Sequence, residues 1–227
     1  KSDVDTRSDF LSNPVNIIEN KLFPMDNYGT GMTPFYTVLS LWVGLLLLAS
    51  MLTVEAEGEY SAASQYFGKM LLFMTIAIIQ AIIVSLGDLY VLKIYCVNPA
   101  LFVLSSVFTS IIFTFILYSL CSVLGNVGKV LGIVLLVLQI GGSGGTFPIQ
   151  LTPKFFQAIN PFLPFTYAIS LARESIGGVV QSVLVKDIVV LLIFGAIFIL
   201  ISLFLKKPIN KLLHGFAESI EKSGIGE

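Results

Sequence analysis

The chain has 227 residues, of which 56% are hydrophobic and only 12% are charged, and its formal net charge is −1. A soluble domain carries about 25% charged residues, so this chain has too few charges to cover a water-exposed surface. The near-neutral charge and the lack of a basic stripe in the sequence exclude nucleic-acid binding, which needs cations along the phosphate backbone. We therefore expect a protein that lies mostly in a lipid bilayer.

The first 33 residues are polar and rich in turn-forming residues, a composition that is typical of a linker. We interpret residues 1–33 as an extracellular juxtamembrane linker. Because the chain begins at Lys1 and not at a methionine, we also expect it to be a fragment of a longer protein.

Five charge-poor segments follow within residues 34–205, the predicted membrane domain. A helix needs about 20 apolar residues to cross about 30 Å of hydrocarbon. Runs such as LLLLASML and IIFTFILY do not alternate apolar and polar residues, which excludes a membrane β-barrel. The sequence therefore predicts an all-α membrane protein with five transmembrane helices. Their expected ranges are about 34–54, 69–93, 100–124, 129–141 and 186–205.

A glycine-rich and proline-rich segment follows the fourth predicted helix. Glycine and proline break helices, and irregular backbone at membrane depth is stable only where protein or water satisfies its polar groups. The aromatic side chains of the segment suit the membrane interface. We expect a re-entrant helical hairpin at residues 142–180 that enters the outer leaflet; the alternative is an exposed glycine-rich loop. The residues of the break are Gly141, Gly142, Gly144, Gly145 and Pro148.

Lysines at the end of the last predicted helix indicate the orientation of the chain. Lys206 and Lys207 follow that helix, and an excess of Lys and Arg marks the cytoplasmic side of a bacterial cell membrane. With five helices, the N-terminus then lies outside and the C-terminus lies in the cytoplasm. Residues 206–227 are predicted to form a cytoplasmic amphipathic tail along the membrane surface, because apolar residues recur there at helical spacing. These residues are Ile209, Leu212, Leu213, Phe216 and Ile220.

Three polar side chains inside the predicted helices form a candidate intramembrane polar site: Gln80, Asp88 and Gln139. A carboxylate in a membrane helix is costly, so Asp88 has either a structural role, paired or hydrated, or a place on a conduction path. The two glutamines are expected to make interhelical hydrogen bonds. Arg173 and Glu174 lie on the outer amphipathic part of the predicted hairpin, where a surface ion pair is expected.

The side chains that catalysis or metal binding needs are scarce. The chain has one histidine, His214, and two cysteines, Cys96 and Cys121, which fall near opposite faces of the predicted membrane domain. This set cannot form a tetrahedral zinc site or a hydrolase triad. The GNVGKV turn at residues 125–130 lacks the spacing and the Ser/Thr of a phosphate-binding loop. We expect no catalytic, cofactor or metal site, and the protein is not expected to be an enzyme.

Several segments resemble one known family. The turn LGNVGK (Leu124–Lys129) and the following LLVLQIGGSGGTFPIQLTPKFFQAINPFLPFTYAISLARE (Leu135–Glu174) resemble the C-terminal membrane domain of the phage infection protein (Pip/YhgE-like) family. The resemblance covers residues 10–205. The segment EGEYSAASQYFGKMLLF (Glu57–Phe73), which precedes QAIIVSLGD (Gln80–Asp88), is most similar to the type VII secretion accessory protein (EsaA/YueB-like) branch of Gram-positive bacteria.

This resemblance implies an upstream helix and a long extracellular region before the chain, followed by a five-helix block similar to an ABC-2-type exporter permease. It also implies a homodimer and a coupling segment in the first cytoplasmic loop. The candidate residues of that coupling loop are Glu55, Glu57, Glu59, Tyr66 and Lys69.

Two functions follow as hypotheses. The first is a multi-pass anchor, or scaffold, with accessory roles in type VII protein secretion or as a phage receptor, and with secretion components or a phage tail protein as partners. The alternative is the permease subunit of an ABC-2-type exporter driven by a separate ATPase. The lipid bilayer is a partner in both.

Overall fold

In a computed structural model, residues 27–53 and 62–222 are described, and all their regular elements are helical. Four helices are long and apolar enough to cross a membrane, at Tyr28–Met51, Tyr66–Val91, Pro99–Leu124 and Gln181–Phe204. The α-helices are α2 (Tyr28–Met51), α3 (Ala62–Leu86), α4 (Pro99–Leu124), α5 (Asn126–Gly142), α6 (Lys154–Ile159), α7 (Pro164–Gly177) and α8 (Gln181–Lys222). Shorter elements are the π-helix η1 (Gly87–Val91) and the 3₁₀-helices η2 (Ile149–Leu151) and η3 (Asn160–Phe162).

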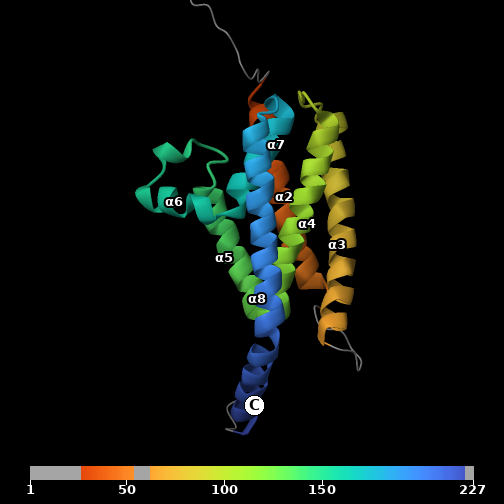
Figure 1. Cartoon of the computed structure of the whole chain (residues 1–227), viewed down its shortest axis with the longest axis vertical. Coiled ribbons are helices and arrows are strands. Elements are labelled where there is room, and N and C mark those ends of the chain that lie inside the picture. The colour runs from red at the N-terminus through yellow and green to blue at the C-terminus, as the bar shows by residue number, and fades with distance from the viewer. Residues whose placement is uncertain (1–26, 54–61, 223–227) are drawn as a thin grey trace, which may run out of the picture.

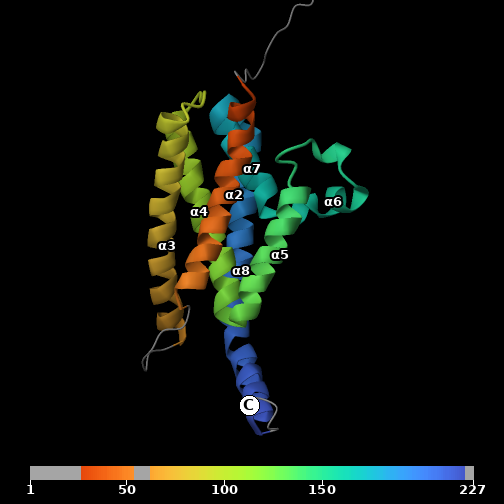
Figure 2. The same cartoon turned by 180° about the vertical axis from the view of Figure 1, so that it is seen from behind.

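The long helices run up and down in an elongated bundle (Figures 1 and 2). We name the two ends of this bundle by the turns found there. At the Gly125 end, α2 ends, α3 starts and α4 passes into α5; at the Gly178 end, α2 and α4 start and α7 passes into α8. The fourth predicted span, 129–141, corresponds to α5, which has only 17 residues. The count of five crossings, and re-entry of residues 142–180 into a membrane, therefore stay predictions.

Helix α4 lies at the centre of the bundle and contacts α2, α3, α5, α7 and α8. Its ring of Phe113 packs against the rings of Trp42 on α2 and Phe165 on α7, at centroid distances of 4.9 and 5.4 Å. The indole N–H of Trp42 donates to the carbonyl oxygen of Gly132 on α5 at 3.2 Å. This aromatic cluster fixes the relative positions of three helices by close packing, and the indole hydrogen bond joins α5 to them.

Two helices begin earlier than their hydropathy predicts. Helix α2 starts at Tyr28 because the side chain of Asn27 accepts a hydrogen bond from the backbone N–H of Thr30 at 2.8 Å, as an N-cap does. Helix α3 starts at Ala62, so Tyr66 lies within its first two turns, and a coupling role for this residue stays a prediction. Tyr66 is buried, and its hydroxyl lies 2.8 Å from Oγ of Ser119 on α4.

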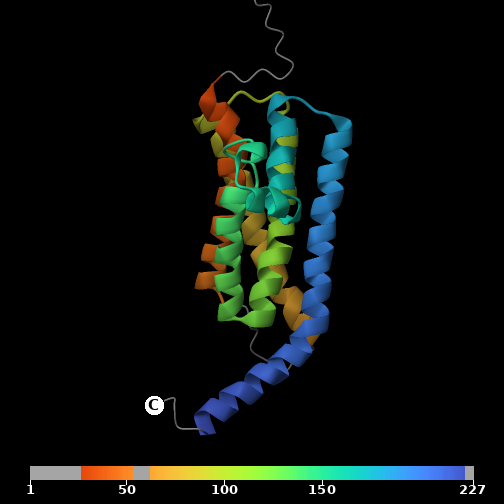
Figure 3. The ribbon, with the colours of Figure 1, turned by 90° about the vertical axis from the view of Figure 1, so that its left-hand side faces the viewer.

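Helix α8 is continuous from Gln181 to Lys222, so the segment expected as a separate tail is part of one 42-residue helix. Its last part runs obliquely away from the bundle (Figure 3). Most of the predicted linker and the acidic residues of the predicted coupling loop, Glu55, Glu57 and Glu59, lie outside the described residues.

Candidate functional site

Helices α5 and α7 each cover only part of the length of the bundle. Helix α5 rises from the Gly125 end and stops part of the way along, and α7 starts near that depth and continues to the Gly178 end (Figure 3). The chain between them, residues 143–163, extends sideways and carries α6 (Figure 1). We call α5, this excursion and α7 together the broken crossing.

Side-chain hydrogen bonds hold the two halves of the broken crossing together. Oε1 of Gln139 near the end of α5 accepts the backbone N–H of Phe165 in the first turn of α7 at 3.2 Å. The amide of Asn160 donates to the carbonyl oxygen of Gly142 at 2.7 Å and to Oγ1 of Thr166 at 3.0 Å. The bonds to Phe165 and Gly142 satisfy backbone groups that a helix break leaves without helical partners.

Two buried polar groups at the same break have no hydrogen-bond partner among the described residues. They are Nε2 of Gln139 and Oγ of Ser143, whose residues are 0% and 5% exposed. A buried polar group without a hydrogen bond lowers the stability of the fold by about 1–3 kcal/mol, and such groups are rare in native proteins. Inside a membrane protein they can receive water or a polar group of a passing molecule.

The predicted break residues lie at the upper end of α5 and in the turn that follows. Gly141 and Gly142 still belong to α5, whereas Gly144 has a φ of +69°, a conformation that favours glycine. Gly145 is buried against α2, where a β-carbon would collide with an aromatic ring. Pro148 precedes η2. Glycine therefore serves here both for a turn and for a close approach to α2.

The expected ion pair between Arg173 and Glu174 does not form. The guanidinium of Arg173 donates from Nη2 to the carbonyl oxygens of Gly144 and Gly145, at 3.1 and 2.9 Å. The carboxylate of Glu174 instead accepts the backbone N–H of Val180, just after the end of α7. Neighbouring helix residues point in different directions, so each finds a backbone partner on its own side.

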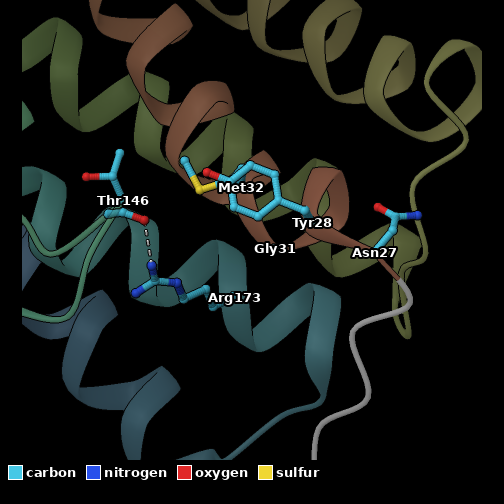
Figure 4. Close-up of a pocket in the computed structure, with 7 residues that line it drawn as sticks. Asn27, Tyr28, Gly31, Met32, Thr146 and Arg173 are labelled. Atoms are coloured by element: carbon cyan, nitrogen blue, oxygen red, sulfur yellow. Dashed lines mark hydrogen bonds between the residues drawn. The ribbon is translucent and has the colours of Figure 1, made fainter.

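A cavity of about 440 Å³ lies where the broken crossing meets the start of α2 (Figure 4). Its residues come from two distant parts of the sequence. They include Asn27, Tyr28 and Met32 on one side, and Gly145, Thr146 and Arg173 on the other.

The predicted intramembrane polar residues do not form one site. Oδ2 of Asp88 in η1 accepts a hydrogen bond from Oγ1 of Thr37 at 2.6 Å, and Nε2 of Gln80 on α3 donates to the carbonyl oxygen of Ser40 at 2.9 Å. Both pairs join α2 to the helix formed by α3 and its continuation η1, and we call them the α2–α3 polar seam. Gln139 belongs to the broken crossing instead.

One buried carboxylate was missed in the sequence. Asp187 on α8 is 2% exposed, accepts a hydrogen bond from Ser170 on α7, and has an Oδ2 without a partner among the described residues. The sequence placed it at the start of a helix, where charged residues are common. The sequence signal is the four-residue spacing of Asp187, Leu191 and Gly195, which puts them on one face of a helix, and the structure buries all three.

The remaining predicted coupling residue, Lys69, is a half-buried residue of α3 near the Gly125 end. Among the described residues, no three His, Cys, Asp or Glu side chains gather closely enough to hold a metal ion.

Comparisons with known proteins agree with the helical architecture. The family described as ABC-2 family transporter protein matches residues 5–204 of the chain. The chain is also 34% identical, over 168 residues, to the protein named "Uncharacterized protein YhgE" of Bacillus subtilis (strain 168). That match covers 73% of this chain and 22% of the relative, so the chain spans less than a quarter of the relative's length. No solved structure matches the chain.

Proposed function

The chain belongs to the ABC-2 family of transporter proteins, and from this premise we propose that it is the permease part of an exporter driven by a separate ATPase. The observation that carries the proposal is the broken crossing, with the buried and unpartnered polar groups of Gln139 and Ser143 at its break. The ATPase is proposed because members of this family usually work with one.

Transport requires polar contacts at membrane depth, and interrupted helices are one way to provide them. Half-helices expose backbone groups near the middle of the membrane, where a continuous helix would keep them bonded. The residues at this break combine such a discontinuity with side-chain donors that lack partners among the described residues. In a passive anchor, the same unpartnered groups would lower stability and serve no function.

The position of Tyr66 supports a mechanical link between the ATPase and the bundle. We propose that the Gly125 end faces the cytoplasm, that the ATPase contacts the chain around residues 54–69, and that two copies of the bundle form a homodimer. Tyr66 ties the start of α3 to Ser119 of α4, and its ring packs 5.2 Å from that of Tyr118. A force applied at the start of α3 would therefore reach the central helix.

Purification of the full-length protein from its native membrane in mild detergent tests this proposal. We expect an ATP-hydrolysing subunit to co-purify, and we expect the Ser143→Ala variant to lower the ATPase activity of the complex by a few fold. Ser50→Ala is the control, because the exposed Ser50 hydroxyl bonds only to its own helix at 2.9 Å. A complex that lacks any ATP-hydrolysing subunit would contradict the exporter role.

A second candidate function is the anchor of a large extracellular region in type VII secretion or phage adsorption. It is favoured by one observation, that the chain spans only 22% of the length of its relative. Similarity to the secretion branch stays a prediction. Deletion of the full-length gene, followed by assays of protein secretion and phage adsorption, separates this role from export.

A further inference from the structure

The described lining of the cavity between the start of α2 and the broken crossing has a positively charged side chain and no negatively charged one. That side chain is Arg173, which is half-buried. No carboxylate among the described residues pairs with this guanidinium. A half-buried cation that has no carboxylate beside it among the described residues favours a negatively charged occupant of the cavity.

The contacts of Arg173 hold the guanidinium in place without neutralising it. One nitrogen, Nη2, donates to the carbonyl oxygens of Gly144 and Gly145. The other N–H groups make no hydrogen bond with the described residues, and a guanidinium presents five donors in a rigid fork. Figure 4 shows this group beside Thr146, with Tyr28 and Met32 across the cavity.

The neutral lining residues add donors and one apolar surface. Oδ1 of Asn27 is occupied by the N–H of Thr30, which leaves its NH₂ group as a donor. Tyr28 and Thr146 contribute hydroxyl groups, and Met32 contributes an apolar wall. A fixed guanidinium surrounded by neutral donors suits a phosphate group, which accepts several hydrogen bonds at once.

We propose that this cavity binds a phosphate-bearing anion, carried either by a lipid headgroup or by a soluble phosphate ester. The aromatic lining residue Tyr28, which is 81% exposed, favours the membrane surface as the location of the cavity. The site does not depend on whether the chain transports a substrate.

The test uses the full-length protein in detergent and a pair of variants of equal size. Thr146 is exposed, so Thr146→Glu and Thr146→Gln should both fold. The Glu variant places a carboxylate beside Arg173 while leaving the arginine and its backbone bonds intact. Binding of short-chain phosphatidylglycerol, glycerol 3-phosphate and phosphate-free diacylglycerol is measured by calorimetry for each variant.

We expect Thr146→Glu and Arg173→Gln to weaken phosphatidylglycerol binding by about tenfold or more, because a charge-assisted hydrogen bond is lost. Thr146→Gln should bind like the native protein. Tight binding of phosphatidylglycerol alone identifies a headgroup, and equal binding of glycerol 3-phosphate identifies a soluble ester. Equal affinities of the Glu and Gln variants, or diacylglycerol bound as tightly as phosphatidylglycerol, would overturn the proposal.

Discussion

Two kinds of segment run along the length of the bundle. One kind is a single long helix, as in α2, α3 and α4, and the other is the broken crossing. In the long helices, buried polar side chains bond either to their own helix, as Ser106 does to the carbonyl oxygen of Phe102, or to a neighbouring helix. Tyr66 bonds with Ser119 in this second way, and Ser110 donates to the carbonyl oxygen of Ala77 at 2.9 Å. The broken crossing is two shorter helices joined by a few side-chain bonds, with two polar groups left without partners among the described residues. The long helices also leave one such group, the buried hydroxyl of Tyr118 on α4, whereas the broken crossing has two within five residues of each other at its break.

This difference indicates where stability and activity reside. Packing and satisfied hydrogen bonds stabilise a fold, whereas unsatisfied polar groups cost stability and persist where a function needs them. Substitutions in the long helices should therefore affect unfolding most. Substitutions at the break should affect activity more than stability.

The largest expected effect is the loss of the central aromatic ring of the long helices. Trp42 is completely buried between Phe113 and Phe165. Trp42→Ala should lower the free energy of unfolding by about 3–5 kcal/mol, because it leaves a cavity and frees the carbonyl of Gly132. Titration with SDS in mixed micelles measures this, and Leu47→Ala, at a 60% exposed position of the same helix, is the control. Equal losses in the two variants would contradict the packing argument.

Two buried serines give the sharpest test of the comparison. Ser119→Ala should cost about 1–2 kcal/mol, since it leaves the buried hydroxyl of Tyr66 without this partner. Ser143→Ala should be neutral or stabilising by up to about 1 kcal/mol, since it removes an orphaned hydroxyl. Both free energies are measured in the same SDS titration. A loss at Ser143 as large as the loss at Ser119 would mean that the Ser143 hydroxyl has a structural partner.

The α2–α3 polar seam should show a smaller, pairwise effect. Thr37→Val removes the donor to Asp88, and Asp88→Asn keeps an acceptor but removes the charge. We expect each single change to cost about 1 kcal/mol, and a coupling energy of about 0.5–1 kcal/mol in the double-mutant cycle. Additive effects, with no coupling, would show that this hydrogen bond contributes nothing to stability.

The smallest expected effect is on the rate at which a cysteine is labelled, and it tests which end of the bundle faces the outside of the cell. Cys96 lies between η1 and α4 at the Gly178 end, and burial raises the pKa of its thiol. In a Cys121→Ala background, labelling by an impermeant maleimide should be slow at pH 7 and should rise about tenfold per pH unit below the pKa, because the thiolate reacts. Labelling of intact cells is expected if the Gly178 end is outside. Labelling only after the cytoplasmic side is opened would reverse the proposed orientation.

The sequence predicted well where structure depends on neighbouring residues. Helix α4, expected at 100–124, covers Pro99–Leu124, because Asn98 caps it, proline occupies its first position, and Gly125 with a φ of +57° ends it. The break near Gly144 was likewise expected, since glycine marks positive φ. Each of these signals lies within a few residues of the feature that it predicts.

What the sequence missed depends on contacts between distant residues. The burial of Tyr66 depends on Ser119, and the burial of Asp187 depends on which face of α8 meets α7. The cavity lined by Arg173 joins residues near 30 to residues near 146 and 173. Hydropathy reports how apolar a segment is, but it does not report which segments become neighbours.

The length of α8 has a mechanical consequence. Its apolar part, Gln181–Phe204, has 24 residues, or about 36 Å at about 1.5 Å per residue, which already exceeds the hydrocarbon thickness of about 30 Å. Residues 205–222 add about 27 Å of unbroken helix beyond it. Tilting the membrane part by about 10° would swing the far end of this extension by roughly 5 Å. A small rearrangement beside Asp187 would thus be magnified into a large displacement on the opposite side of the bilayer.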